Sequence, residues 1–245
     1  MRTIGDLYIE SRLSDGAGIR VTNDFLSKLT KGFAKRTSRF MYAHVGVPFV
    51  QKERQLHSLL IPALADITDM FMIEFPIKRN WSSLSTRDFD DSHGWVDYWC
   101  RYRDIVFFIE LKHGFISSKT GLVNQSLHET WGKAREQLDV IEKEVDIHKE
   151  WSSGVFRIAL EIVPLYETVN SGEPKILSDL DNMFKIQKNC IDELNPSPNW
   201  SAIWRLHKEL AGPHQFTNTK ECYPGIVFLA RVSKINRKKV QTQKV

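Results

Sequence analysis

The chain has 245 residues, of which 42% are hydrophobic and 26% are charged, as in an ordinary soluble protein with one sizeable core. Its 34 Lys and Arg residues exceed its 30 Asp and Glu residues by four, and this net charge of +4 is too small to indicate a nucleic-acid partner by itself. The three cysteines form no C-x-x-C pair, which argues against a zinc cluster and for reduced thiols. The sequence has neither a signal peptide nor an apolar run long enough to span a bilayer, so we expect a cytoplasmic protein without membrane contact.

The first fifty residues predict a helical extension. Residues 1–21 suggest only a turn, and Thr22 or Asn23 is then expected to cap a helix. One side of this helix is apolar, and packing against the core explains it. The other side is basic, and it is either solvated or in contact with the phosphates of a nucleic acid. The basic residues that we single out are Lys35, Arg36 and Arg39.

A second helix is predicted over residues 51–66, where apolar residues recur on one side. Glu53 lies in its first turn, and a carboxylate there also interacts favourably with the helix dipole. Residues 70–77 predict a strand, in which Pro76 indicates the strand end or an edge position. The polar residues 79–92 that follow contain several aspartates, but their spacing favours a solvated connection over a cation site.

Residues 93–113 predict a β-hairpin, because two segments rich in β-branched and aromatic residues flank a polar turn. If the turn is centred between residues 103 and 104, Asp97 falls opposite Glu110, and Lys112 points to the same face. Two opposed carboxylates repel each other, and a divalent cation with oxygen ligands would remove that repulsion. The alternative is a surface hairpin whose charged side chains are simply solvated.

The second half of the chain predicts further helices and strands. A long helix is expected over residues 125–149, with Lys133 and Gln137 one turn apart on a common side. Three more elements are expected after a strand over residues 154–163: a partly helical segment over 176–194, a short helix over 201–210 and a final strand over 225–232.

The hairpin resembles the PD-(D/E)xK nuclease superfamily, in which an acidic residue on one strand is followed by E-x-K on the next. Asp97 matches the first acidic position, and Glu110 and Lys112 match the E-x-K. Val96 stands where the motif has proline, a frequent departure in this family. The resemblance covers roughly residues 52–163 and identifies a superfamily, not a particular protein.

The resemblance extends to the flanking helices and to the order of elements. Related nucleases often carry a Glu on the helix before the hairpin and a polar residue on the helix after it, which here correspond to Glu53 and Gln137. Ile141 stands where the RecB-like branch has tyrosine, which argues against that branch. The order of a helix, three strands, a helix and a strand (αβββαβ) is that of the restriction-endonuclease-like core, a central mixed β-sheet flanked by helices in the α/β (α+β) class. We therefore predict a single domain over residues 1–245, with this core at 51–163, an N-terminal helical extension at 1–50 and a C-terminal extension at 164–245.

The resemblance implies a nuclease that hydrolyses phosphodiester bonds, and the expected substrate is DNA. It implies that Mg²⁺ or Mn²⁺ is held by Asp97, Glu110, the carbonyl of Leu111 and Glu53. Lys112 would orient or deprotonate the attacking water, or stabilise charge that develops on the phosphate, and these roles stay open. The sequence leaves endonucleolytic and exonucleolytic cleavage equally open.

Two classes of function are left by these observations. The first is the metal-dependent nuclease, in which Gln137 assists at the scissile phosphate. The second is a catalytically inactive protein of the same fold that binds nucleic acid or serves in an assembly, because a fold alone does not establish an activity. The intact Asp97, Glu110 and Lys112 set favours the nuclease. The expected partners are a nucleic acid and a second copy of the chain in a homodimer, and the expected nucleic-acid contacts are Lys35, Arg36, Arg39 and Lys133.

Overall fold

A computed structural model of the whole chain describes residues 4–14, 16–44, 46–79, 92–139, 141, 152–169, 179–215 and 219–235. Two of the segments discussed above fall largely outside these ranges. They are the polar connection, of which residues 80–91 are not described, and the second half of the long helix, where residues 140 and 142–151 are not described.

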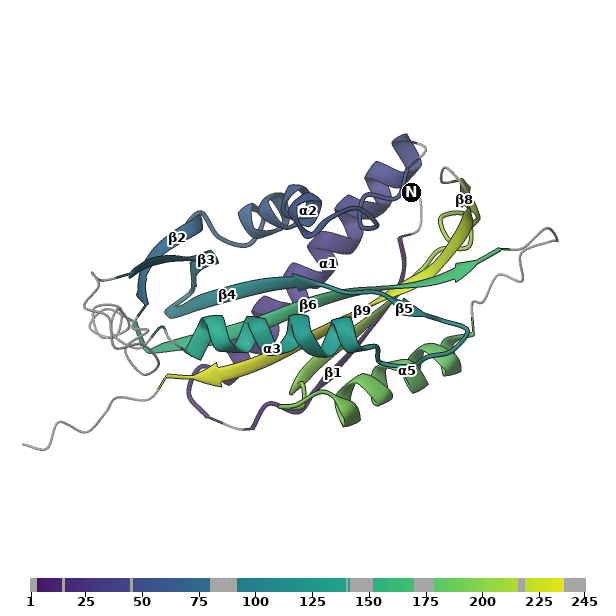
Figure 1. Cartoon of the computed structure of the whole chain (residues 1–245). Coiled ribbons are helices and arrows are strands. Elements are labelled where there is room, and N and C mark those ends of the chain that lie inside the picture. Colours follow the sequence, from purple (N-terminus) through teal and green to yellow (C-terminus); the bar gives the residue numbers. More distant parts are fainter. Residues whose placement is uncertain are drawn as a thin grey trace, which may run out of the picture.

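One mixed β-sheet forms the centre of the molecule (Figure 1). The strands β4 and β5 run parallel to β6, while the other strand pairs within the described ranges are antiparallel. This arrangement confirms the predicted mixed sheet of an α/β protein. In sheet order the strands are β1 (Gly5–Ser11), β7 (Trp200–Leu206), β9 (Lys220–Lys234), β6 (Gly154–Thr168), β4 (Ile105–His113), β3 (Ser92–Tyr102) and β2 (Phe71–Arg79), with β5 (Ile116–Ser117) beside β6 and β8 (His214–Gln215) beside β9.

Helices cover both faces of the sheet (Figure 1). The helices α1 (Ile19–Ala43) and α2 (Glu53–Ala65) pack on one face, and α3 (Gln125–Asp139) and α5 (Leu180–Glu193) pack on the other. None of these four helices is both long enough and apolar enough to cross a membrane.

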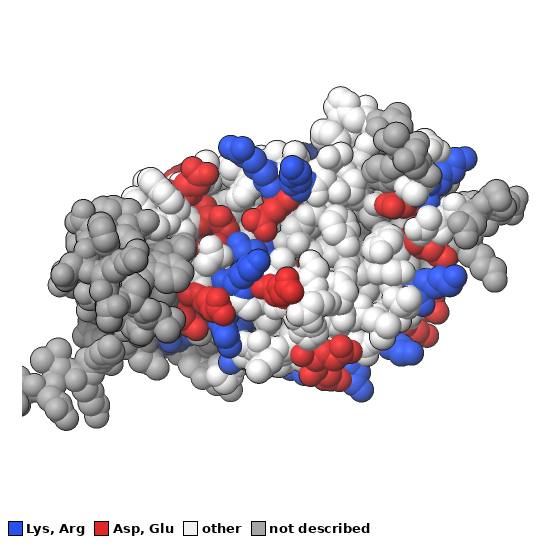
Figure 2. Space-filling view, in the orientation of Figure 1, with Lys and Arg blue, Asp and Glu red and all other residues white. Residues whose placement is uncertain are grey.

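The face of the molecule that carries α3 shows charges of both signs (Figure 2). Lys and Arg side chains alternate with Asp and Glu side chains across the middle of this view, and no large area of one sign is seen there. A patch of uniform positive potential therefore does not cover this face, and any nucleic-acid contact on it would depend on individual side chains.

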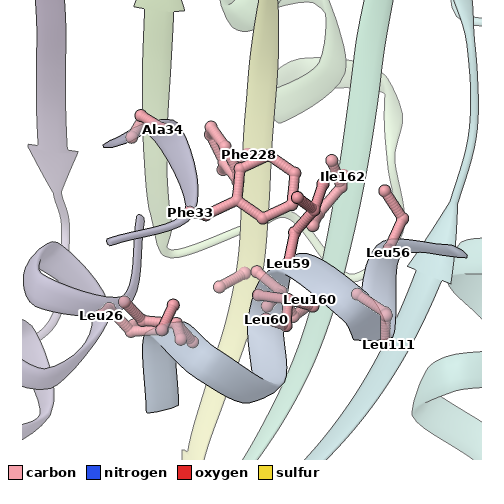
Figure 3. Close-up of a cluster of buried hydrophobic side chains, with 14 of the residues drawn as sticks. Leu26, Phe33, Ala34, Leu56, Leu59, Leu60, Leu111, Leu160, Ile162 and Phe228 are labelled. Atoms are coloured by element: carbon pink, nitrogen blue, oxygen red, sulfur yellow. The ribbon is translucent and has the colours of Figure 1, made fainter. Parts of the chain in front are cut away.

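A large cluster of buried apolar side chains fixes α1 and α2 on the sheet (Figure 3). Phe33 of α1 meets Phe228 of β9 edge to face, with the ring centroids 5.5 Å apart. Leu56 of α2 and Leu111 of β4 are both fully buried in the same cluster. Burying each such side chain stabilises the fold by about 1.5–3 kcal/mol. The cluster therefore holds the beginning of α2, including Glu53, against the end of β4.

The elements of the middle of the chain follow the predicted order. Among the described residues, the helix α2 is followed by the strands β2, β3 and β4, then by α3 and β6, with the two-residue β5 added between β4 and α3. The strand β2 lies at the edge of the sheet, as Pro76 indicated. The sheet does not end with this core, however, because β7 and β9 from the predicted C-terminal extension continue it beyond β6.

The predicted short helix over residues 201–210 is wrong, because Trp200–Leu206 forms the strand β7. Trp204 belongs to the apolar cluster beneath α1, whereas Ile203 belongs to the cluster beneath α5, so both faces of the strand are buried. A strand buried on both faces loses the alternation of polar and apolar residues. Its sequence pattern cannot then be distinguished from that of a buried helix.

The predicted helical extension over residues 1–50 is correct only in part. The strand β1 forms within it and pairs antiparallel with β7. The helix α1 begins at Ile19, earlier than predicted, after Gly18 with φ 90° in the left-handed region. Thr22 lies inside the helix, where its hydroxyl donates to the carbonyl of Gly18 instead of capping the N-terminus.

Three other elements differ from their predicted bounds. The helix α3 ends at Asp139, and Ile141, which was predicted to be helical, has no regular secondary structure. Arg157 donates to the carbonyl of Leu138 at 3.0 Å and so satisfies one of the acceptors that a helix end leaves open. The strands β6 and β9 extend well beyond residues 154–163 and 225–232. The partly helical segment is confirmed as α5.

Candidate active site

The hairpin has the register that its sequence predicts. Tyr102 pairs with Ile105, and Tyr98 pairs with Ile109, which places the turn between residues 103 and 104. Arg103 in this turn has φ 54°, in the left-handed region that tight hairpin turns require. The ladder between β3 and β4 ends at Tyr98 and Ile109, one pair before Asp97 and Glu110.

Asp97 lies where β3 and β4 separate. Its carboxylate Oδ2 accepts a hydrogen bond from the backbone N–H of Leu111 at 2.7 Å, so the side chain takes the place of a backbone partner. Pairing between β2 and β3 is also interrupted here, because Glu74 opposite Asp97 has φ 48° and belongs to no ladder pair. In Figure 1, β2 and β3 curl away from β4. The fork between the two strands therefore exposes the side chains at the end of β4 to α2.

Three oxygen atoms surround the ammonium group of Lys112. Its Nζ lies 2.9 Å from Oε1 of Glu110 and donates to the carbonyl oxygen of Leu111, also at 2.9 Å. Oε1 of Glu53, from the first turn of α2, lies 3.9 Å from the same nitrogen. The structure thus brings Glu110, Lys112 and Glu53 together at the fork, beside Asp97. The pairing argument predicted Asp97, Glu110 and Lys112 on one face, and the resemblance added Glu53.

The buried position of this group shifts its pKa values. Burial raises the pKa of Glu53 above its ordinary value, although the nearby Lys112 charge opposes the shift. For Lys112 burial acts to lower the pKa, but Glu110, Glu53 and Asp97 outweigh it and leave the pKa above its ordinary value. Lys112 is therefore a charged ammonium in this arrangement, and the acidic side chains are its counter-ions.

Glu161 is a further carboxylate beside the group, and we did not predict it from the sequence. It is paired with Lys112 across the parallel strands β4 and β6, and it is completely buried. A hydrogen bond of 2.5 Å joins its Oε1 to the hydroxyl of Thr130 on α3. Burial raises the pKa of Glu161 to about 8. The signal in the sequence was a single carboxylate within the otherwise apolar segment 158–163, since such residues are rarely buried without a specific partner.

Two histidines lie close to the group. His57 follows Glu53 by one turn of α2, and its Nδ1 is 2.5 Å from the hydroxyl of Tyr98. Burial, and then the charges of Asp97 and Glu53, raise the pKa of Tyr98, so the phenol is neutral and shares a hydrogen bond with Nδ1 of His57. His113 at the end of β4 has its pKa lowered to about 4 by burial, and it is therefore neutral at pH 7.

Within the described ranges, no hydrogen bond joins Gln137 to the carboxylates at the fork. This residue lies seven residues after Thr130, about 10 Å further along α3. Its Oε1 is buried and has no hydrogen-bond partner among the described residues. Lys133 is exposed on the outer side of the same helix. The catalytic role of Gln137 and the nucleic-acid contact of Lys133 therefore stay predictions.

The basic residues of α1 form a line on its exposed side. Lys35 and Arg39 are exposed and belong to a series that recurs every three or four residues. Arg36, in contrast, is half-buried and forms an ion pair with Asp66 at 2.7 Å, so its charge is already compensated. The members of the series are Arg20, Asp24, Lys28, Lys31, Lys35 and Arg39, with Asp24 the acidic exception.

Gly114 permits the close approach of α3 to the end of β4, and this predicts the effect of an alanine. A Cβ atom at this position would lie 2.4 Å from Cδ1 of Leu127 and 3.1 Å from Oε1 of Glu161. Since Leu127 is fully buried, Gly114→Ala should lower the free energy of unfolding by about 1–3 kcal/mol. Urea denaturation would measure the loss.

Gly132 on α3 provides the matched control for that substitution. No atom lies within 4 Å of a Cβ built on it, and its position is helical. Gly132→Ala should therefore raise the free energy of unfolding by about 0.5–1 kcal/mol, through helix propensity alone. Equal effects of the two substitutions would contradict the close contact at Gly114.

The donor atoms at the fork are those that a hard divalent cation prefers. Carboxylate and carbonyl oxygens from Glu110, Leu111 and Glu53 converge on one positive charge, and the carboxylate of Asp97 is beside them. Within the described ranges, no three His, Cys, Asp or Glu side chains stand close enough to hold one ion as they are now placed. The ammonium of Lys112 takes up the point where these oxygens meet. Comparisons with protein-family models, with curated proteins and with solved structures found no match.

Proposed function

We propose that this protein is a metal-dependent nuclease that hydrolyses phosphodiester bonds, with DNA as its expected substrate. One observation carries the proposal: the oxygens of Glu110, Leu111 and Glu53 converge on a single positive charge, at a fork in the sheet beside Asp97. Such a set of oxygen donors binds Mg²⁺ or Mn²⁺ readily. The resemblance of the hairpin to the PD-(D/E)xK superfamily supports the same function.

The residues of the fork have separate tasks in this proposal. Asp97, Glu110, the carbonyl of Leu111 and Glu53 would hold Mg²⁺ or Mn²⁺, which supplies Lewis-acid activation of the phosphate and of water. Lys112 holds this point as an ammonium in the metal-free protein, and it would be displaced to the side by a bound cation. From there it would orient the attacking water or compensate negative charge on the phosphate. Because Glu110 is only 3% exposed, bulk water is kept away from this charge and the interaction is strengthened.

A cleavage assay tests the proposal directly. Supercoiled plasmid, single-stranded DNA and RNA would each be incubated with the protein in the presence of Mn²⁺, Mg²⁺ or EDTA. We expect metal-dependent nicking of at least one substrate and none with EDTA. Binding without cleavage of any substrate would contradict the nuclease.

The catalytically inactive nucleic-acid-binding protein is the second candidate. The ion pair between Lys112 and Glu110 favours it, because this contact gives the carboxylate a counter-ion without a metal. A metal-binding measurement distinguishes the two candidates, since the inactive protein requires no cation. A homodimer and a cytoplasmic location stay predictions for either candidate.

The exposed side of α1 gives a prediction for substrate binding. If Lys35 and Arg39 contact phosphates, their joint replacement by Ala should weaken DNA binding and reduce the slope of log K against log salt by about 2. Arg36 is left unchanged, because Asp66 already compensates its charge. Fluorescence anisotropy at several salt concentrations would measure both quantities.

The double replacement of Lys185 and Lys188 by Ala is the matched control. Both residues are exposed on α5, which lies on the opposite face of the sheet from α1. This control variant should have nearly the same affinity for DNA, and the same slope of log K against log salt, as the wild type. If the α1 variant behaves like the control, the basic side of α1 is only solvated.

A further inference from the structure

The buried pair of Glu161 and Thr130 does not belong to the proposed metal ligands, and its hydrogen bonding can be accounted for atom by atom. The hydroxyl oxygen of Thr130 is 3.0 Å from the carbonyl oxygen of Ser126, 3.1 Å from that of Leu127 and 2.5 Å from Oε1 of Glu161. A threonine hydroxyl carries one hydrogen, while all three neighbours are oxygens. One hydrogen cannot fully serve three acceptors.

A proton on Glu161 resolves this arrangement. The hydroxyl of Thr130 then donates its hydrogen bond to the helix carbonyls, as threonine commonly does within helices. Its oxygen accepts a hydrogen bond from the protonated carboxyl group of Glu161. Oε2 of Glu161 is also buried and has no hydrogen-bond partner among the described residues. A buried carboxylate with one unsatisfied oxygen would cost several kcal/mol, whereas a neutral acid costs much less. The raised pKa of Glu161 agrees with this account.

The neighbour of Glu161 in the sheet is Lys112. The two residues are register partners on adjacent parallel strands, so their side chains leave the same face of the sheet roughly 5 Å apart. An ionised carboxylate at that distance would compete for the ammonium group. The ammonium nevertheless bonds to Glu110 and to the carbonyl of Leu111. A neutral Glu161 explains why Lys112 turns toward the fork.

We propose that Glu161 is a positioning residue for Lys112: as a neutral acid held by Thr130, it fills the space beside the lysine without attracting its ammonium. Thr130 links this acid to α3, and Gly114 leaves the room that the acid requires. The effect on cleavage rests on the proposed function, whereas the placement of Lys112 does not.

Infrared spectroscopy of the metal-free protein tests the neutral acid. At pH 7 the wild type should show the carbonyl stretch of a protonated carboxylic acid, and Glu161→Gln should lack it. In Thr130→Val the band should move to higher frequency because the acid loses its acceptor, while Thr130→Ser should keep the wild-type frequency. A wild-type spectrum without the band would overturn the proposal.

Chemical labelling tests the placement of Lys112 without any cleavage assay. An amine-reactive reagent and mass spectrometry would give the labelling rate of Lys112 relative to that of the exposed Lys185 in the metal-free protein. Glu161→Ala should increase this ratio several-fold, and Glu161→Gln should restore it. If Glu161→Ala does not fold, Thr130→Val takes its place and should also increase the ratio. An unchanged ratio in a folded variant would refute the positioning role.

The cleavage assay then shows whether this position matters for catalysis. Glu161→Ala should lower kcat by ~10- to 100-fold with little change in KM, as for other residues that orient a catalytic group. Glu161→Gln should recover kcat to within ~3-fold of the wild type. Equal losses in both variants would show that the acid itself, rather than its shape and neutrality, is needed, and would overturn the proposal. A wild type that cleaves nothing would refute the proposed function but leave the spectroscopic and labelling results to decide the position of Lys112.

Discussion

Glu110→Gln should abolish Mn²⁺-dependent cleavage, lowering the rate by ~1,000-fold or more, because the amide removes the charge of a central cation ligand. It should also remove the stabilisation that Mn²⁺ gives to the folded protein, since a ligand that binds only the native state raises Tm. In the metal-free protein the variant should lose about 2 kcal/mol of stability, because the ammonium of Lys112 loses its charged partner at 2.9 Å. Thermal melts with and without Mn²⁺, beside a nicking assay, would measure all three effects.

Lys112→Met separates the loss of catalysis from the loss of metal binding. It breaks the same ion pair and should be equally inactive, but it keeps all four proposed oxygen donors. Because the ammonium occupies the point where those oxygens meet, its removal should strengthen Mn²⁺ binding by about tenfold or more. The Tm shift caused by Mn²⁺ should therefore be larger in this variant than in the wild type.

Glu136→Gln is the charge-matched control for both variants, since Glu136 is exposed on α3. It should retain cleavage and the metal-induced Tm shift. Two results together would contradict the role of Glu110 as a ligand: the Tm of the wild type does not respond to Mn²⁺, and Glu110→Gln cleaves normally. Glu110 would then be only a counter-ion of Lys112.

The stability of the protein should fall as the pH rises from about 4.5 to about 8, and Glu161 should be a principal cause. Its pKa is about 8 in the folded protein against an ordinary value of 4.5, so the folded state retains a proton that the unfolded state has lost. Stability from this group is therefore complete below pH 4.5 and is lost as the pH approaches 8. At about 1.4 kcal/mol per pH unit, the interval corresponds to a loss of about 5 kcal/mol.

Glu161→Gln isolates this contribution from those of neighbouring groups. The charges that face Glu161 are Lys112 and Glu53, and both remain in the variant. The difference in unfolding free energy between the variant and the wild type should grow in favour of the variant as the pH rises. Urea denaturation at several pH values would measure it, with Glu193→Gln on the exposed side of α5 as a control that should show no such trend. A constant difference across this pH range would mean that Glu161 is ionised in the folded protein.

Local chain geometry explains why the hairpin could be predicted from the sequence. Its two strands are joined by a tight turn, so the position of the turn determines every pair up to Tyr98 and Ile109. The same reasoning placed Asp97 near Glu110, and the helical periodicity around Glu53 placed α2 before the hairpin. What it did not anticipate was the fork, because the left-handed conformation of Glu74 is not encoded in a simple alternation of side chains.

The contacts that were missed are those between segments distant in sequence. The pairing of Glu161 with Lys112 depends on β6 lying parallel to β4, and the hydrogen bond to Thr130 depends on how α3 crosses both strands. The strand β7 was missed because both of its faces are buried. In each case the deciding interaction is tertiary and outweighs local propensity.

The position of β9 in the sheet has a consequence for synthesis of the chain. This strand is the last of the described elements, yet it lies between β6 and β7, and β1 reaches the sheet only through β7. While the ribosome is still translating residues before 220, β2, β3, β4 and β6 can already pair, but among the described strands β1 and β7 are not hydrogen-bonded to any of these four. We expect a nascent chain to hold its fork and its first strand as separate pieces until the final strand emerges and joins them. Contacts between such distant segments form slowly, so the sheet should close late, after β9 has emerged.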